Sequence, residues 1–245
     1  MHFHSCCSFF VLFLFMSSTL AMDDTPIPSY STELKAFMTE QTKAKDPFSA
    51  EDRAVMTKAG ESLARQMPQP GLAVGQKAPA FILQDALGNK VSLYDELKQG
   101  PVILVFYRGA WCPFCNLHLH ILHKSQDAFA QYNAQMIAIT PQQPDKSAEQ
   151  INKDGYAFKV LSDLDSNVMR AYKLYFELND KLIQVYKKHG LDIEAYNGQG
   201  RNVLPVPGTF VIDQNGVIRA SYADTDYTKR AEPAEIIQAL KNLNK

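Results

Sequence analysis

The chain has 245 residues, 46% of them hydrophobic, which is enough for one ordinary globular core with additional segments. Its formal net charge is −1 and it contains no basic block or stripe, which argues against nucleic acid as a partner. Beyond the N-terminus, no run is long and apolar enough to cross a bilayer.

The first residues have the pattern of a secretory signal peptide. An apolar block at 9–16 is followed by small residues, with Thr19 and Ala21 suited to cleavage after Ala21. The segment before the block contains no Lys or Arg, which is unusual for a signal peptide. We expect removal of residues 1–21, a secreted or periplasmic protein, and no membrane association afterwards. The alternative is a membrane anchor formed by an uncleaved leader.

A helical extension is predicted between the leader and the main domain. Residues 23–30 are polar and contain prolines, which is typical of a mobile arm. Residues 32–43 and 50–66 indicate amphipathic helices, the second with Ser49 as its N-cap. These helices would cover the domain or a partner subunit of a homo-oligomer. The expected division is a signal peptide at 1–21, a helical extension at 22–73 and a main domain at 74–245.

The main domain is predicted to alternate strands with helices. Its first hairpin spans 81–93 around a Gly-Asn turn signal, and the apolar run 102–106 has the character of a buried strand. This alternation favours an α/β sandwich with a mixed central sheet. The other expected elements are short helical turns at 95–97, helices at 116–130, 146–153, 167–178, 181–188 and 233–243, a core strand at 135–139, an edge strand at 158–161, and a hairpin at 209–220.

Two cysteines lie where the central strand ends and the next helix begins. Cys112 falls at or near the N-cap, Pro113 at the first helical position, and Cys115 one turn further in. Side chains three residues apart share a helix face, so the two sulfurs can reach each other. The start of a helix favours an anion, and it lowers the pKa of C-x-x-C thiols by about one unit or more. The pair therefore predicts a redox dithiol.

Other roles for the pair are disfavoured. A disulfide closing so short a loop contributes only about 2 kcal/mol, and a closed zinc site needs four ligands. Of the histidines that follow, only His120 and His123 share a helix face, so we expect no metal site and no other cofactor. The tryptophan, the proline and the helix start argue against inert thiols. Cleavage of the leader would also remove Cys6 and Cys7 and leave only the two motif cysteines. This favours a reactive role for the pair over a structural disulfide.

The order of elements and the sequence Trp-Cys-Pro-Phe-Cys resemble the thioredoxin superfamily, and more closely its peroxiredoxin-like branch, which is related to alkyl hydroperoxide reductases and thiol-specific antioxidant proteins. That branch adds a hairpin ahead of the first core strand, here 81–93. The resemblance covers about 74–245. It implies a thioredoxin-like α/β/α sandwich with a mixed central sheet and an N-terminal β-hairpin, to which this chain adds the helical extension.

The peroxiredoxin pattern Pro-x-x-x-Thr-x-x-Cys fits the chain incompletely. Cys115 falls on the peroxidatic cysteine, Cys112 on the threonine and Arg108 on the proline. The family's later active-site arginine falls on Pro207, where thioredoxins have a cis-proline, and we expect a cis bond before Pro207. Arg108 and Arg201 are the candidates to replace the missing oxyanion stabilisers, although arginine is more often exposed. We expect a substrate site at Trp111, Arg108 and Pro207.

Two functions stay open at this point. A thiol peroxidase would form a sulfenic acid from a hydroperoxide and then the Cys112–Cys115 disulfide, which a thioredoxin-like or other thiol donor reduces. A protein thiol–disulfide oxidoreductase would attack a substrate disulfide with Cys112, the sulfur expected to be more exposed, and resolve it with Cys115. The hairpin favours the first function and the extracytoplasmic location favours the second. The third hypothesis, a non-catalytic binding module, is the weakest, because both cysteines are present.

Overall fold

The computed structural model describes residues 26–43 and 46–243. The signal peptide expected at 1–21 lies outside the described residues and stays a prediction. Within the described ranges, no helix combines the length and hydropathy needed to span a bilayer.

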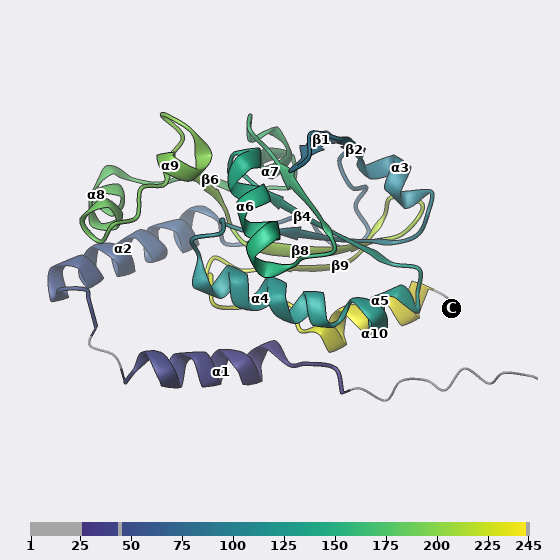
Figure 1. The fold of residues 1–245 in the computed structure, drawn as a ribbon, viewed down its shortest axis with the longest axis horizontal. Helices are drawn as coiled ribbons and strands as arrows, with labels where there is room; N and C mark the ends of the chain where they lie inside the picture. The colour runs from purple at the N-terminus through teal and green to yellow at the C-terminus, as the bar shows by residue number, and fades with distance from the viewer. Residues whose placement is uncertain (1–25, 44–45, 244–245) are drawn as a thin grey trace, which may run out of the picture.

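A mixed sheet lies at the centre of the molecule (Figure 1). The strands of its central part, β3, β4 and β5, run parallel, and the neighbours on both sides are antiparallel. The sheet order is β2-β1-β5-β4-β3-β8-β9, and a separate two-stranded ribbon pairs β6 with β7. The strands are β1 (Ile82–Asp85), β2 (Lys90–Ser92), β3 (Val102–Phe106), β4 (Gln135–Thr140), β5 (Lys159–Ser162), β6 (Tyr175–Glu177), β7 (Val203–Pro205), β8 (Gly208–Ile212) and β9 (Ile218–Ala223).

Helices cover both faces of this sheet, which confirms the predicted α/β/α sandwich with a mixed central sheet. Residues of α4, α5, α6 and α10 pack with one face of the strands, and residues of α3 and α7 pack with the other. The helices are α1 (Tyr30–Gln41), α2 (Ala50–Gln66), α3 (Leu93–Leu97), α4 (Pro113–Lys124), α5 (Gln126–Ala130), α6 (Pro144–Asp154), α7 (Asn167–Ala171), α8 (Asp180–Lys188), α9 (Glu194–Asn197) and α10 (Pro233–Leu243).

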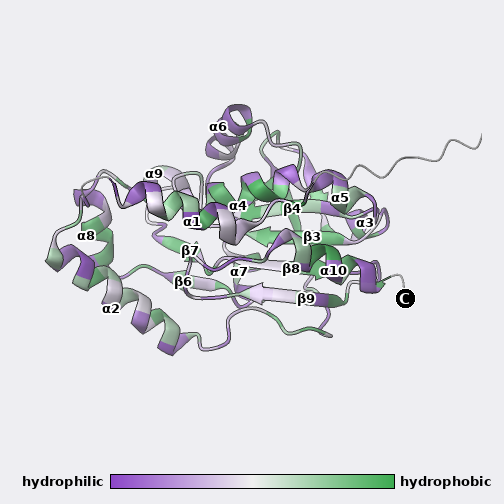
Figure 2. Cartoon of the chain, turned by 90° about the horizontal axis from the view of Figure 1, so that it is seen from below, coloured by the Kyte–Doolittle hydropathy of each residue, from purple (hydrophilic) through white to green (hydrophobic). Residues whose placement is uncertain are grey.

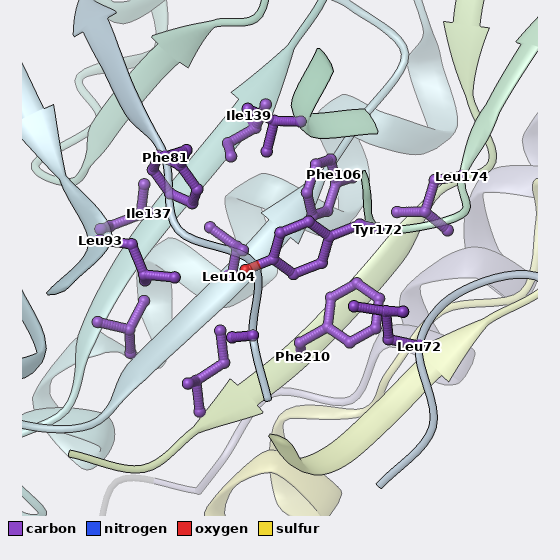
Figure 3. Packing of buried hydrophobic residues seen from close by; sticks show 14 of the residues in the cluster. Leu72, Phe81, Leu93, Leu104, Phe106, Ile137, Ile139, Tyr172, Leu174 and Phe210 are labelled. Carbon is purple, nitrogen blue, oxygen red and sulfur yellow. The ribbon is translucent and has the colours of Figure 1, made fainter. Parts of the chain in front are cut away.

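The central strand β3 contributes to both layers of the core. All five of its residues are buried, and they point alternately to the two faces, so the strand is apolar throughout. On the side shown in Figure 3, Phe106 packs against Tyr172 and Phe210, with ring centroids 5.0 and 6.0 Å away. This packing fixes the end of β3, and the cysteine motif follows directly.

The strand predicted at the edge of the sheet lies in its interior, so that prediction is wrong. β5 pairs with β4 on one side and with β1 on the other, where Gln84 lies opposite Ser162. The predicted hairpin itself is confirmed, and its pairing onto β5 covers the edge that β5 would otherwise present. An alternating pattern within one strand does not reveal which distant hairpin will pair with it.

The helix predicted over 167–178 is also wrong in its second half. α7 ends at Ala171, and Lys173 adopts a left-handed conformation with φ of 57°, which stops the helix. Phe176 then lies in β6 opposite Leu204 of β7. The backbone groups of this segment therefore pair with a strand far along the chain, and this pairing prevails over the local helical spacing.

The N-terminal extension packs on the domain of its own chain. α1 lies across α4, and α2 lies beside α8, as Figures 1 and 2 show. The Phe37 ring meets the Phe114 ring edge-on at 5.5 Å. The Asp52 carboxylate accepts hydrogen bonds from Lys188 at 2.8 Å and from His189 at 3.1 Å, and these bonds hold its pKa below the ordinary value.

Candidate active site

The two motif cysteines lie at the start of α4, as the sequence predicts. Cys112 is the N-cap residue, Pro113 opens the helix, and Cys115 lies within its first turn. Both are free thiols in the structure. Cys112 is 1% exposed and Cys115 is fully buried. Cys112 is thus the more exposed of the two by only this small margin, because the side chains around the helix start cover both sulfurs.

The surroundings shift the pKa values of the two thiols in opposite directions. Burial opposes ionisation of Cys115, but the hydrogen bond with Cys112 and the charges of Arg230 and Arg108 outweigh it, and the pKa of Cys115 falls to about 5. Burial and the same hydrogen bond raise the pKa of Cys112 well above its ordinary value. The negative charge of the pair therefore resides on Cys115 at neutral pH.

Arg230 supplies a positive charge next to Cys115 that no sequence pattern indicates. Its Nη2 atom lies 3.7 Å from the Cys115 sulfur. Arg230 is half-buried in the loop between β9 and α10, and it is 115 positions away from Cys115 in sequence. No motif surrounds it, so only the folded arrangement identifies it.

Arg108 is buried against the cysteines and is not exposed to solvent. It is 6% exposed, its Nη2 atom donates to the Tyr186 hydroxyl at 2.9 Å, and its guanidinium lies 4.8 Å from the Trp111 ring and 4.7 Å from the Tyr227 ring. Among the described residues, no carboxylate forms a salt bridge with it. The pKa of Arg108 is nevertheless raised despite the opposing effect of burial, because negative charge on the neighbouring tyrosines and cysteines favours its charged form.

Arg201 does not join the site. Its guanidinium donates to the carbonyl of Pro141 at 2.9 Å, to that of Asn197 at 2.7 Å and to that of Asp163 at 3.1 Å. These contacts join the Arg201 side chain to the end of α9 and to the loops that follow β4 and β5. Arg201 therefore has a structural position, and the hypothesis that it replaces an oxyanion stabiliser finds no support.

The predicted cis bond before Pro207 is wrong. No cis peptide bond occurs in residues 26–43 and 46–243, so the bond is trans. The preceding Val206 donates its N–H to the carbonyl of Leu174 at 2.7 Å, which continues the extended chain from β7 toward β8. An extended connection needs no reversal of the chain, so the ordinary trans isomer fits.

A buried polar network fixes the loop in front of Cys112. The Ala110 N–H donates to Gln142 at 3.0 Å, and the Ala110 carbonyl accepts from Asn116 at 2.7 Å. Gln150 joins Asn116 to the Tyr107 hydroxyl, at 3.0 and 2.9 Å. Both backbone groups of Ala110 are thus held, so the helix start and its thiols have a defined position. No motif in the sequence marks these amide side chains.

A cavity of about 1700 Å³ opens between the extension and the domain. Arg108, Pro113, Phe114, Pro207 and Tyr227 line its inner wall, and residues of α1 and α2 line the outer wall. Two of the three predicted substrate-binding residues therefore share one cavity next to the cysteines. The third, Trp111, does not line the cavity but lies against Arg108.

Replacing Gly109 with alanine is expected to displace Trp111. The residue has φ of +148°, and an added Cβ would lie 2.5 Å from the indole nitrogen. We expect the free energy of unfolding to fall by about 1–3 kcal/mol, because the added Cβ strains the backbone and the contact. We also expect a red-shifted Trp111 emission, because the indole would move toward water. Trp111 is the single tryptophan of the chain, so intrinsic fluorescence reports on it alone. The control is Gly155→Ala, which is strained at φ +69° but meets no atom within 4 Å. Unchanged emission in Gly109→Ala would contradict the described contact.

The remaining polar residues do not suggest a metal centre. In the part of the chain that the structure describes, no three His, Cys, Asp or Glu side chains gather where they could hold an ion. His118, on α4, instead bonds through Nε2 to the carbonyl of Ala231 at 3.1 Å.

Comparisons with known proteins agree with this geometry. The profile of the AhpC/TSA family matches residues 74–221. A candidate peroxiredoxin of Mycobacterium tuberculosis is 33% identical over 147 residues, which are 60% of this chain and 82% of that protein. Peroxiredoxin Bcp of Bacillus subtilis is 25% identical over 71% of this chain and 98% of its own length. The thiol-disulfide oxidoreductase ResA of Geobacillus kaustophilus is 26% identical over 60% of this chain and 68% of its own length.

Solved structures show the same fold. The crystal structure of the peroxidoxin BcpB from Mycobacterium tuberculosis superposes with a TM-score of 0.57 at 20% identity, and covers 71% of this chain and 99% of that one. The family profile covers the hairpin, the central strands and the cysteine motif, which are the parts that carry the resemblance seen in the sequence. The chain therefore belongs to the AhpC/TSA family.

Proposed function

We propose that the protein is a thiol peroxidase in which Cys115 is the nucleophile and Cys112 is the resolving cysteine. The observation that carries the proposal is the placement of the Cys115 sulfur 3.7 Å from the Arg230 guanidinium, in surroundings that lower its pKa to about 5. A thiolate is the reactive form of cysteine, and a nearby cation also stabilises negative charge that develops on a leaving oxygen.

The proposed first step is an attack of the Cys115 thiolate on the terminal oxygen of a hydroperoxide. A sulfur–oxygen bond forms, the oxygen–oxygen bond breaks, and the leaving alkoxide or hydroxide takes up a proton. Cys115 becomes a sulfenic acid and the peroxide is reduced to an alcohol or water. The Arg230 guanidinium contacts the sulfur, and its charge and that of Arg108 favour both the initial thiolate and the charge on the departing oxygen.

In the second step, Cys112 attacks the sulfenic sulfur. The Cys112–Cys115 disulfide forms and hydroxide leaves, taking up the thiol proton as water. A dithiol donor, thioredoxin-like or another thiol, then returns two electrons and restores both thiols. The position of both cysteines at the start of α4 supports this step, because Cys112 at the N-cap and Cys115 three residues later project from the same side of the helix.

A protein thiol–disulfide oxidoreductase is the second candidate, supported by the similarity to ResA. It would need Cys112 as an accessible nucleophile. The burial of Cys112 and the raised pKa of its thiol favour the peroxidase. An extracytoplasmic location, after removal of 1–21, would favour this second candidate.

The function is tested by giving the reduced full-length protein hydrogen peroxide or an organic hydroperoxide, with dithiothreitol or thioredoxin as the donor. We expect peroxide consumption in step with oxidation of the donor, and little reduction of insulin disulfides. Insulin reduction without peroxide consumption would replace the peroxidase with the second candidate.

The rate of reaction with peroxide is expected to stay high into mildly acidic solution. Because the pKa of Cys115 is lowered from an ordinary value of 9.0 to about 5, the thiolate is present above pH 5 and is lost as the pH falls through that value. The second-order rate constant should be half-maximal near pH 5 and level at neutral pH. Stopped-flow Trp111 fluorescence measures it. A rate that still rises above pH 8 would show an unperturbed thiol.

A further inference from the structure

The loop that carries Arg230 and the helix α1 both lie outside the segment that matches the family. The match begins at residue 74 and ends at 221, whereas α1 ends at Gln41 and Arg230 lies nine positions after the match. Arg230 nevertheless reaches the Cys115 sulfur. A loop side chain holds a charge in one place only if the loop itself is fixed, so the contacts of residues 228–232 decide whether this charge is available.

Contacts from the start of α1 fix this loop on both sides of Arg230. Before it, the Tyr30 hydroxyl donates to the carbonyl of Thr228 at 2.7 Å. After it, the two carboxylate oxygens of Glu232 accept the backbone N–H groups of Tyr30 and Ser31, each at 2.7 Å. The first N–H groups of a helix have no partners within the helix and attract an anion, so Glu232 satisfies them.

The helix that carries Cys115 also contacts this loop. His118 donates from Nε2 to the carbonyl of Ala231 at 3.1 Å, and its ring meets the Tyr30 ring at 5.3 Å. Burial and the charge of Arg230 lower the pKa of His118 to about 3, so the neutral ring keeps this hydrogen bond. Tyr30 is 2% exposed, and burial raises its pKa to about 12, so its hydroxyl remains a donor. The residue predicted to lie in a mobile arm is thus part of the core.

We infer that α1 positions an active-site charge. Tyr30 and Glu232 are positioning residues, which hold residues 228–232 so that the Arg230 guanidinium stays against the Cys115 sulfur. The inference rests on the proposed function, in which Cys115 is the nucleophile. No described hydrogen bond joins Tyr30 or Glu232 to the sulfur, so both act through Arg230.

Loss of these contacts would let the loop carry Arg230 away from the sulfur. The thiolate would then lose one of its two nearby cations, and the pKa of Cys115 would rise. Five other titratable groups interact electrostatically with Cys115. They are Tyr30 on α1, Tyr107 and Arg108 in the loop after β3, Cys112 at the start of α4, and Tyr156 in the loop after α6. None of the proposed substitutions other than Tyr30→Phe changes any of these groups.

The test measures the pH dependence of iodoacetamide alkylation at Cys115 in the full chain, with Cys115 and Cys112 distinguished by tandem mass spectrometry. We expect the apparent pKa to rise by about half a unit to one unit in Tyr30→Phe and in Glu232→Gln. Tyr94→Phe is the matched control, because it also removes a hydroxyl that donates to a backbone carbonyl, that of Ala78 at 2.9 Å, away from the cysteines. In Tyr94→Phe, the apparent pKa of Cys115 should equal that of the wild type.

Repeating both substitutions in an Arg230→Ala background separates positioning from general structural damage. Arg230→Ala alone should raise the pKa by about one unit or more, and neither substitution should raise it further. A shift in either single variant that disappears in this background supports the inference. No shift in both variants, or a shift that persists without Arg230, overturns it. Alkylation needs no peroxide, so a wild type that fails to consume peroxide would remove the proposed function and leave this test intact.

Discussion

Peroxide consumption is expected to fall by about a thousandfold or more when Cys115 is replaced with serine, because a serine hydroxyl stays protonated and cannot displace the oxygen. Cys112→Ser should still consume one equivalent of peroxide at a rate near that of the wild type. It should then stop or recycle slowly, because no partner thiol remains to form the disulfide. The assay is peroxide consumption with one equivalent of peroxide and then with an excess.

The two serine variants are matched controls for each other. Each removes one sulfur from the same helix start, and both sites are equally covered by the surrounding side chains. If Cys112→Ser lost the first turnover while Cys115→Ser kept it, the roles of the two cysteines would be reversed. The site would then resemble that of a disulfide reductase.

Replacing Phe210 with alanine is expected to lower the free energy of unfolding by about 3–5 kcal/mol. Phe210 is fully buried, its ring centroid lies 5.4 Å from that of Tyr172, and its strand pairs with β3 opposite Leu104. The cavity left behind cannot close without moving the central strand. Chemical denaturation followed by Trp111 fluorescence measures the change.

Leu87→Ala provides the comparison for that experiment. Leu87 is 85% exposed in the turn of the hairpin, so its removal should change stability by less than about 0.5 kcal/mol. A loss below about 1 kcal/mol in Phe210→Ala would show that the aromatic cluster can repack, contrary to the close-packed core described above.

Local signals in the sequence were sufficient for the features that depend on neighbouring residues. The hairpin around residues 88–89, the buried strand at 102–106 and the helix beginning at Pro113 all follow from turn chemistry, apolar runs and capping. The position of both cysteines at one helix start follows from the same signals. The likeness of the motif to the peroxiredoxin branch then led to the family that the comparisons confirm.

Features that depend on distant pairing could not be found in the same way. Arg230 comes from a loop 115 positions beyond Cys115, and the structure alone brings the two together. The interior place of β5 depends on the hairpin that pairs with it, and the trans bond before Pro207 depends on the extended connection between β7 and β8. The burial of both thiols depends on covering segments that the motif does not specify.

If Cys115 is the nucleophile, its sulfur is the one that peroxide oxidises first, and this sulfur can be identified directly. The reduced protein receives one equivalent of peroxide in the presence of dimedone, which traps sulfenic acids, and tandem mass spectrometry locates the adduct. In Cys112→Ser, where no resolving thiol competes with the trap, we expect an adduct on Cys115. In Cys115→Ser we expect no comparable adduct on Cys112. An adduct on Cys112 that forms as fast as the one expected on Cys115 would contradict the assignment of Cys115 as the nucleophile.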